Sequence, residues 1–203
     1  MGEIRVPIPI VPLGDRAVRI PRPPRSSARA LLDELRTWPS VVDVVVGRED
    51  VAVYFAGSPV VDPAAIARLT RLEARDEEAR IVELQVVYDG PDLEEVARLS
   101  GLSVDDVIAR HTAPLYEVET MGFAPGFAYL TGLDHALHLP RRATPRTRVP
   151  GGSVGLAGGY TGVYPFDSPG GWHLLGRVVD GPMFDARGAR LRLGDRVRFL
   201  RCG

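Results

Sequence analysis

Glycine and proline crowd the second half of this chain, and they restrict its possible folds more than any other feature. Among 203 residues, 22 are glycine and 18 are proline. From Leu115 onward they separate short apolar runs such as Tyr116 to Met121 and His173 to Val179. Glycine and proline interrupt helices, whereas short apolar runs bounded by turn residues are typical of strands. This half is therefore predicted to be a compact β-barrel with long ordered loops.

The first half alternates between strand-like and helix-like segments. Four apolar runs have strand composition: Arg16–Ile20, Val41–Val46, Val51–Phe55 and Ile81–Val87. Two segments have apolar residues at helical spacing: Ala30, Leu31, Leu32 and Leu35 in one, and Ile66, Leu69 and Leu72 in the other. Ser26 or Ser27 can cap the first helix, and Pro63 suits the first turn of the second. The order β-α-β-β-α-β predicts a ferredoxin-like domain over residues 1–88, so the chain is expected to be α+β.

The stretch PDLEEVARLSGLSVDDVIARH predicts two short helices joined by a glycine turn. Such a pair resembles a DNA-binding helix-turn-helix, but the second helix would present Asp105 and Asp106 to the phosphates. We therefore expect residues 89–112 to be a helical pair that links the domains, followed by the barrel domain over 113–203.

The charged residues exclude several functions. The net charge is −1, so no basic surface is expected for nucleic acid or anionic lipid, and no apolar run is long enough to span a membrane. All 25 basic residues are arginine, which excludes a P-loop lysine, a Schiff-base lysine and a biotinylated lysine. The N-terminus is a poor secretion signal, and the one cysteine, Cys202, can form no internal disulfide. We expect a cytoplasmic protein.

Arginines and glycines gather between the predicted strands of the second half. The arginines before the glycine loop are Arg141, Arg142, Arg146 and Arg148, and the glycines are Gly151, Gly152, Gly155, Gly158 and Gly159. Guanidinium groups bind carboxylate or phosphate with paired hydrogen bonds, and backbone amides of a glycine loop can approach the same anion. This pattern favours an anionic ligand, although a solvated surface run would have the same composition.

Three smaller patterns have both a catalytic and a structural interpretation. GGSVG at 151–155 matches the G-x-S-x-G motif, but the LAGGYTG that follows cannot form the required helix, so a backbone turn is expected in place of a nucleophilic Ser153. His135 and His138 are two ligands where metal centres usually take three or four, so no metal is expected. His173, beside Trp172, has the chemistry to transfer protons or to be tied to a carbonyl.

Three long motifs carry a family resemblance. The strings GFAPGFAYLTGLD, PRRATPRTRVPGGSVGLAGGYTGVYP and SPGGWHLLGR occur in this order, and the chain resembles the allophanate hydrolase subunit 1 family. The resemblance implies a ferredoxin-like domain and a cyclophilin-like β-barrel. It also implies two partners, one of the allophanate hydrolase subunit 2 family (the C subunit of 5-oxoprolinase) and one of the LamB/YcsF type (the A subunit). Together such subunits open 5-oxoproline to glutamate while hydrolysing ATP.

With that chemistry as the hypothesis, the site residues receive roles. The assignments are Arg146, Arg148 and Arg177 for anion contacts, Gly151, Gly152 and Ser153 for amide donors, His173 as proton carrier, Thr161 as a further ligand contact, and Phe123, Phe127, Tyr129 and Tyr164 as walls. ATP, as Mg-ATP, is the expected co-substrate.

Two alternatives remain open from the sequence. One is a KipI-like inhibitor of a sensor histidine kinase, and the other is a carboxyltransferase-type component of a urea amidolyase or allophanate hydrolase system. The chain also departs from the family pattern, since Gly159, Tyr160, Thr161 and Gly162 stand where relatives often have Ala-Gln-Thr-Gly, and Val178 replaces a usual threonine. The departures place the substrate in question more than the fold.

Overall fold

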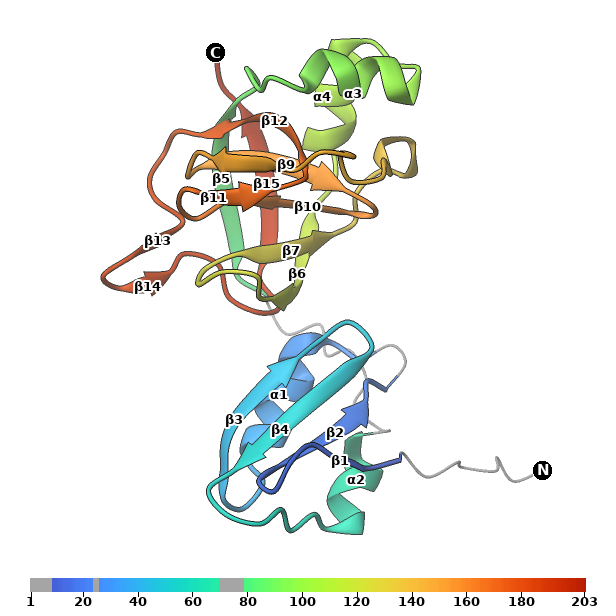
Figure 1. The fold of residues 1–203 in the computed structure, drawn as a ribbon, viewed down its shortest axis with the longest axis vertical. Helices are drawn as coiled ribbons and strands as arrows, with labels where there is room; N and C mark the ends of the chain where they lie inside the picture. The colour runs from blue at the N-terminus through green and yellow to red at the C-terminus, as the bar shows by residue number, and fades with distance from the viewer. Residues whose placement is uncertain (1–8, 24–25, 70–78) are drawn as a thin grey trace, which may run out of the picture. The chain divides into compact units, whose positions relative to one another are not determined.

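The structure is a computed structural model that describes residues 9–23, 26–69 and 79–203. The chain divides into two compact units, residues 1–78 and 79–203 (Figure 1). Each unit has a sheet of its own, and each is described separately below.

The first unit contains one antiparallel four-stranded sheet and two helices. The strands, in order across the sheet, are β1 (Val11–Pro12), β2 (Ala17–Pro21), β4 (Asp50–Phe55) and β3 (Val41–Val46). The helices are α1 (Ala28–Arg36) and α2 (Pro63–Leu69). Helix α1 begins where the Ser27 hydroxyl accepts a hydrogen bond from the Ala30 amide at 3.0 Å, as the N-cap prediction required. Leu31 and Leu35 of α1 are fully buried, so this apolar face forms the core of the unit.

The structure corrects the predicted end of this first unit. Ile81–Val87 is a strand, β5, but it pairs in parallel with β15 (Arg196–Arg201) and belongs to the second unit. This pairing buries Leu84 and Val86. The first unit therefore ends near residue 78, and among the described residues the fourth strand of its sheet is β1 and not the predicted strand at 81–87. Leu72, assigned to the second helix, lies outside the described residues.

The second unit is a closed seven-stranded barrel, which confirms the barrel prediction. Around the barrel the strands are β10 (Tyr160–Val163), β7 (Ala128–Thr131), β6 (Tyr116–Met121), β15, β5, β12 (His173–Val178) and β9 (Ser153–Ala157), and β9 pairs with β10. Two small two-stranded sheets lie outside this ring: β8 (Arg146–Val149) with β11 (Ser168–Gly170), and β13 (Phe184–Asp185) with β14 (Gly188–Ala189).

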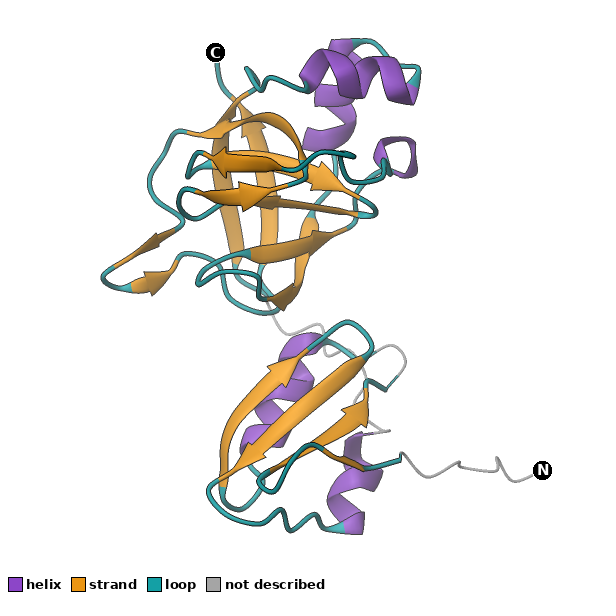
Figure 2. Cartoon of the chain, viewed as in Figure 1, coloured by secondary structure: helices purple, strands orange, loops and turns teal. Residues whose placement is uncertain are grey.

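The predicted helical pair is present, but it is part of the barrel unit and not a linker. Helices α3 (Leu93–Ser100) and α4 (Val104–Thr112) lie at one end of the barrel (Figure 2). Val96 and Val107 are fully buried in the same cluster as the barrel strands. Gly101 between the helices has φ +70°, a conformation that glycine adopts without steric cost. The apolar helix faces thus close one end of the barrel core.

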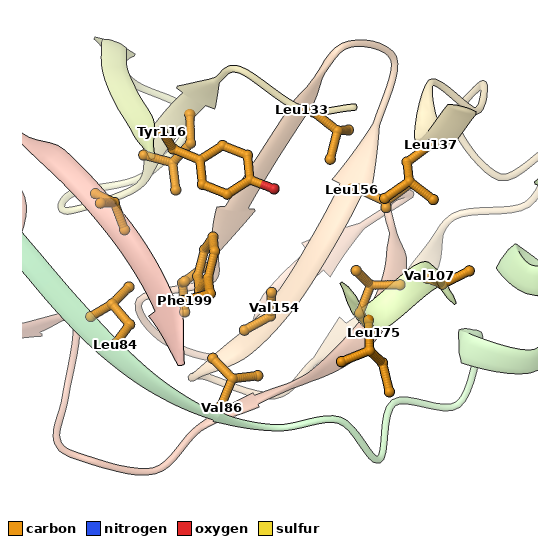
Figure 3. Close-up of a cluster of buried hydrophobic side chains, with 14 of the residues drawn as sticks. Leu84, Val86, Val107, Tyr116, Leu133, Leu137, Val154, Leu156, Leu175 and Phe199 are labelled. Atoms are coloured by element: carbon orange, nitrogen blue, oxygen red, sulfur yellow. The ribbon is translucent and has the colours of Figure 1, made fainter. Parts of the chain in front are cut away.

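The barrel core is continuous and aromatic at one side. Figure 3 shows Tyr116 beside Phe199, with Val86 and Val154 nearby and Leu175 next to Val107. The rings of Tyr116 and Phe199 lie 5.4 Å apart in an edge-to-face arrangement. Because this interior is filled by side chains, a ligand has to bind on a face or rim of the barrel and not inside it.

Candidate functional site

An aromatic pocket lies on the barrel unit, in the glycine- and proline-rich stretch. It is half open and has a volume of about 60 Å³, and its lining residues are Phe123, Phe127, Tyr129, Arg141, Tyr164, Gly170, Gly171 and Trp172. All four aromatic side chains assigned to the site from the sequence meet here, together with Trp172, which the sequence did not assign. A pocket this small is below the usual 300–1,000 Å³ of sites that enclose a drug-sized ligand.

The ring of Phe127 is the centre of the aromatic cluster. Its centroid lies 5.3 Å from that of Phe123, 5.0 Å from Tyr129, 5.5 Å from Tyr164 and 5.4 Å from Trp172, each at a steep interplanar angle. Such edge-to-face contacts are the preferred packing of aromatic pairs and fix ring orientations. The walls are therefore rigid, apart from Phe123, which is 59% exposed.

Two glycines let this cluster close up. A Cβ at Gly170 would collide with the Tyr164 hydroxyl, and a Cβ at Gly162 would lie 2.7 Å from the carbonyl oxygen of Ala128 and 3.3 Å from the Phe127 ring. Larger residues would push the pocket walls aside at both positions. The glycine content of this stretch is thus explained in part by close packing around aromatic rings.

Arg141 lies at the rim of the pocket, and the backbone on both sides of it is held. The carbonyl oxygen of Pro140 is 3.0 Å from His173 Nε2, and the amide of Arg142 donates to the Gly171 carbonyl at 2.8 Å. Within the described residues, the Arg141 side chain has no carboxylate within 4.0 Å. Its chain neighbour Arg142 and the nearby Arg146 and Arg148 are all paired, as described next.

Arg142 and Arg146 are tied to a buried carboxylate, Asp92. One Asp92 oxygen accepts a hydrogen bond at 2.7 Å from each of the two guanidinium groups, and the other accepts from the Leu174 amide at 2.8 Å. Glu95 accepts a further bond from Arg142 at 2.9 Å. Burial alone would raise the pKa of Asp92, but the hydrogen bonds from Arg146 and Leu174 and the two positive charges hold it below its usual value. Arg146, predicted to contact a ligand anion, is instead neutralised inside the chain.

The other two predicted anion contacts also have carboxylate partners, but at the surface. Arg148 donates to Asp167 at 2.8 Å through Nε, and Arg177 donates to Asp89 at 3.0 Å. Arg148 is 78% exposed, so solvent screens its ion pair strongly. The structure therefore gives the three predicted arginines three separate partners.

The amide groups of the predicted glycine loop are also occupied. The Gly151 amide donates to Asp167 Oδ1 at 2.9 Å, the Gly152 amide to the Tyr164 carbonyl at 2.7 Å, and the Ser153 amide to the Pro150 carbonyl at 3.2 Å. The Gly151 bond is the main cause of a lowered pKa at Asp167, with Arg148 contributing. The three amides of this loop therefore already donate hydrogen bonds within the chain. Ser153 begins strand β9, and the segment after β9 forms strand β10 where a nucleophile motif would need a helix, as the sequence led us to expect.

His173 is buried at the start of β12, and its ring is tied to a carbonyl. Since the Pro140 carbonyl can only accept, His173 Nε2 carries the proton, and Nδ1 has no partner among the described residues. Of the two interpretations derived from the sequence, this contact fits a histidine that is tied to a carbonyl. The geometry makes His173 a clamp on the residue that precedes Arg141.

Thr161 is fully buried and belongs to a network that the sequence did not reveal. His111 Nε2 lies 2.8 Å from Thr161 Oγ1, and the Thr161 hydroxyl donates to the Gly155 carbonyl at 2.9 Å. The Tyr88 hydroxyl is 2.7 Å from His111 Nδ1. Burial lowers the pKa of His111 to about 3, so the ring is neutral near pH 7. A signal was present, because His111 follows Val107 and Ile108 at helical spacing on the buried face of α4.

The described parts of the chain contain neither a cluster of metal ligands nor a membrane-spanning helix. There, no three His, Cys, Asp or Glu side chains are arranged to hold a metal ion, and no helix is long and apolar enough to cross a bilayer. The rings of His135 and His138 lie 4.5 Å apart, and His138 Nε2 is 3.0 Å from the Leu133 carbonyl.

The similarity of this chain to known proteins extends over most of its length. Two relatives are 5-oxoprolinase B subunits. That of Haemophilus influenzae is 39% identical over 94% of this chain and 96% of that protein, and that of Escherichia coli O157:H7 is 42% identical over 84% of this chain and 82% of that protein. The crystal structure of TTHA0988 is 37% identical with a TM-score of 0.75, covering 93% of this chain and 40% of that one. The chain thus spans about two fifths of that solved structure.

The family comparison covers nearly the whole chain. Residues 9–192 match the family described as carboxyltransferase domain, subdomain C and D. This match includes the first unit, the helical pair and the pocket-bearing part of the barrel. The chain therefore belongs to this carboxyltransferase-domain family, together with the 5-oxoprolinase B subunits to which it is similar, as its motifs indicated.

Proposed function

We propose that the chain is one component of a multi-subunit ATP-dependent 5-oxoprolinase, which opens 5-oxoproline to glutamate. The observation that carries the proposal is the similarity to the 5-oxoprolinase B subunit of Haemophilus influenzae, because it extends over 94% of this chain and 96% of that protein. Two sequences that align over nearly their full lengths at 39% identity share a domain organisation, and the aromatic pocket lies in the matched region.

The chemistry of this reaction fits a small pocket with aromatic walls. A lactam carbonyl is a poor electrophile, and phosphorylating its oxygen makes the carbonyl carbon more electrophilic. Water then adds to this carbon, the ring C–N bond breaks with the nitrogen leaving as the amine, and hydrolysis of the resulting acyl phosphate releases glutamate and phosphate. The phosphorylated intermediate has to be shielded from premature hydrolysis, which rigid aromatic walls accomplish. The pocket is half open and has a volume of about 60 Å³, which is too small for a nucleotide, so we place ATP outside it. The exposed Arg148 and Arg177 are our candidates for contact with phosphates held at a boundary between subunits.

The remaining parts of the proposal follow from the family resemblance. The partners are the C subunit, of the allophanate hydrolase subunit 2 family, and the A subunit, of the LamB/YcsF family, and the complex works in the cytoplasm. The barrel is the cyclophilin-like domain, and the first unit is a relative of the ferredoxin-like arrangement with β1 as its fourth strand. The isolated chain is inactive, because the pocket by itself positions no ATP.

The test is 5-oxoproline-dependent ADP release by this chain mixed with its LamB/YcsF-type partner and its allophanate hydrolase subunit 2-type partner. Release that disappears when this chain is left out supports the proposal. Absence of release from well-folded, assembled partners contradicts it, and inhibition of sensor-kinase autophosphorylation would then identify a KipI-like regulator. Transfer of a carboxyl group from a biotinylated partner would identify a carboxyltransferase component.

A further inference from the structure

We propose that Arg141 binds the carboxylate of a small cyclic substrate whose ring lies in the aromatic pocket. The inference rests on the proposed function for the identity of the substrate, 5-oxoproline, but its ligand class follows from the pocket. It also replaces Arg146, Arg148 and Arg177 as the anion contacts of the pocket itself.

The backbone on both sides of Arg141 is held in position. His173 Nε2 donates to the carbonyl of Pro140, and the amide of Arg142 donates to the carbonyl of Gly171. Both partners flank Trp172, a wall of the pocket, so the segment that carries Arg141 is fastened to the segment that forms that wall. The Arg142 side chain anchors the same segment on Asp92 at 2.7 Å. A side chain presented from a fixed backbone loses less conformational entropy when it binds.

The Arg141 guanidinium is free to bind an anion. In the described part of the chain it has no carboxylate partner, whereas Arg142, Arg146 and Arg148 each have one within 3 Å. Its charge reaches the pocket, since it acts to lower the pKa of Tyr164 against the larger, opposing effect of burial. A planar guanidinium matches a carboxylate with two parallel hydrogen bonds.

The space beside Arg141 is small and has aromatic walls. The walls are the rings of Phe127, Tyr129, Tyr164 and Trp172, and Gly170 forms part of the floor because a side chain there would collide with Tyr164. A space of about 60 Å³ with aromatic walls and an arginine at its side suits the face of a five-membered ring and is too small for adenine with ribose. The combination of one arginine and aromatic walls therefore favours a small ring that carries a carboxylate.

The experiment is calorimetric titration of the full chain with three probes of matched shape. 5-Oxoproline has both the lactam and the carboxylate, cyclopentanecarboxylate lacks the lactam, and 2-pyrrolidinone lacks the carboxylate. We expect both carboxylates to bind and 2-pyrrolidinone to bind at least tenfold more weakly. The chain has two tryptophans, so a Trp38→Phe background leaves Trp172 fluorescence as a reporter of pocket occupancy.

Variants separate Arg141 from general effects of charge. Arg141→Met is expected to weaken both carboxylates at least tenfold and to leave 2-pyrrolidinone unchanged, while Arg141→Lys restores part of the affinity. The matched control is Arg98→Gln, which removes an exposed arginine on α3 and should change none of the three affinities. Equal affinity of Arg141→Met and the unaltered chain for 5-oxoproline overturns the inference, as does 2-pyrrolidinone binding as tightly as the carboxylates.

Steady-state kinetics of the assembled enzyme give the second readout. Arg141→Met should raise KM for 5-oxoproline at least tenfold and change kcat by less than threefold. If the isolated chain binds none of the probes, an unchanged KM overturns the inference even though ADP release is lost when the chain is omitted. If the chain binds carboxylates through Arg141 but the assembly never releases ADP, the proposed function fails and the carboxylate subsite stands.

Discussion

The Tyr88 hydroxyl donates a hydrogen bond to Nδ1 of the buried His111 across 2.7 Å, and this fixes the tautomer of the imidazole. The direction follows from the other end of the network. The carbonyl of Gly155 can only accept, so Thr161 donates to it, and His111 Nε2 therefore donates to Thr161. Nδ1 is left as an acceptor. One chain of hydrogen bonds thus joins the residue after β5 to α4, β10 and β9 at the helical end of the barrel.

Removing the Tyr88 hydroxyl should destabilise the barrel. In Tyr88→Phe the Nδ1 of His111 becomes a buried acceptor with no donor, which costs about 1–3 kcal/mol of unfolding free energy. Urea denaturation followed by Trp172 fluorescence in the Trp38→Phe background measures this loss. The control is Tyr54→Phe, which removes a surface hydroxyl and should change stability by less than about 0.5 kcal/mol. Equal stability of Tyr88→Phe and its parent would show that the network contributes nothing to folding.

His111 should also make stability depend on pH in mildly acidic solution. Its pKa is about 3 in the folded chain because of burial, against 6.5 as the ordinary value. Between these values the unfolded chain binds a proton that the folded chain does not, so stability falls as pH decreases through this window. The slope is about 1.4 kcal/mol per pH unit for one such group. His111→Gln removes this titration. Between pH 6.5 and 4.5 the unfolding free energy of the variant should therefore fall less steeply with decreasing pH, by up to about 1.4 kcal/mol per pH unit. Parallel curves for the two proteins would contradict the assignment.

Asp92 should be far more important for stability than its surface counterpart Asp89. Asp92→Asn leaves two partly buried guanidinium groups, those of Arg142 and Arg146, without their shared charge partner, and we expect a loss of about 3 kcal/mol. Asp89→Asn breaks only the exposed pair with Arg177 and should cost less than about 1 kcal/mol. Denaturant midpoints of both variants test the difference. Similar losses for the two would mean that burial of Asp92 does not matter.

Local patterns predicted the secondary structure well and its assembly less well. Ile81–Val87 was recognised as a strand because its apolar composition is local information. Its partner β15 begins at Arg196, and nothing in either segment specifies a parallel pairing across that separation. Because a ferredoxin-like domain needs four strands, the sequence prediction placed β5 in the sheet of the first unit. The helical pair was assigned as a linker for a similar reason, since its apolar faces show burial but not which surface covers them.

The candidate site shows the same limit. The aromatic walls were predictable because Phe123, Phe127, Tyr129 and Tyr164 crowd one loop-rich stretch, where ordered loops tend to form sites. The anion contacts were not, because a run of arginines does not reveal which of them a distant carboxylate neutralises. Asp92 lies 54 residues before Arg146 in the sequence and pairs with its guanidinium group. The described residues provide carboxylate partners for Arg142, Arg146 and Arg148. Among these residues Arg141 has none within 4.0 Å.

The clamp that His173 places on Pro140 should be measurable as ligand affinity. His173→Gln keeps an N–H that can reach the Pro140 carbonyl, whereas His173→Leu fills the site without a donor. If the clamp positions Arg141, His173→Leu should weaken 5-oxoproline binding about tenfold or more, and His173→Gln should retain most of the affinity. Binding of 2-pyrrolidinone, which does not use Arg141, should be alike in both variants. A purely structural role for His173 would instead lower the affinity of both probes together with the melting temperature, so calorimetric titration and thermal unfolding of the same samples separate the two possibilities.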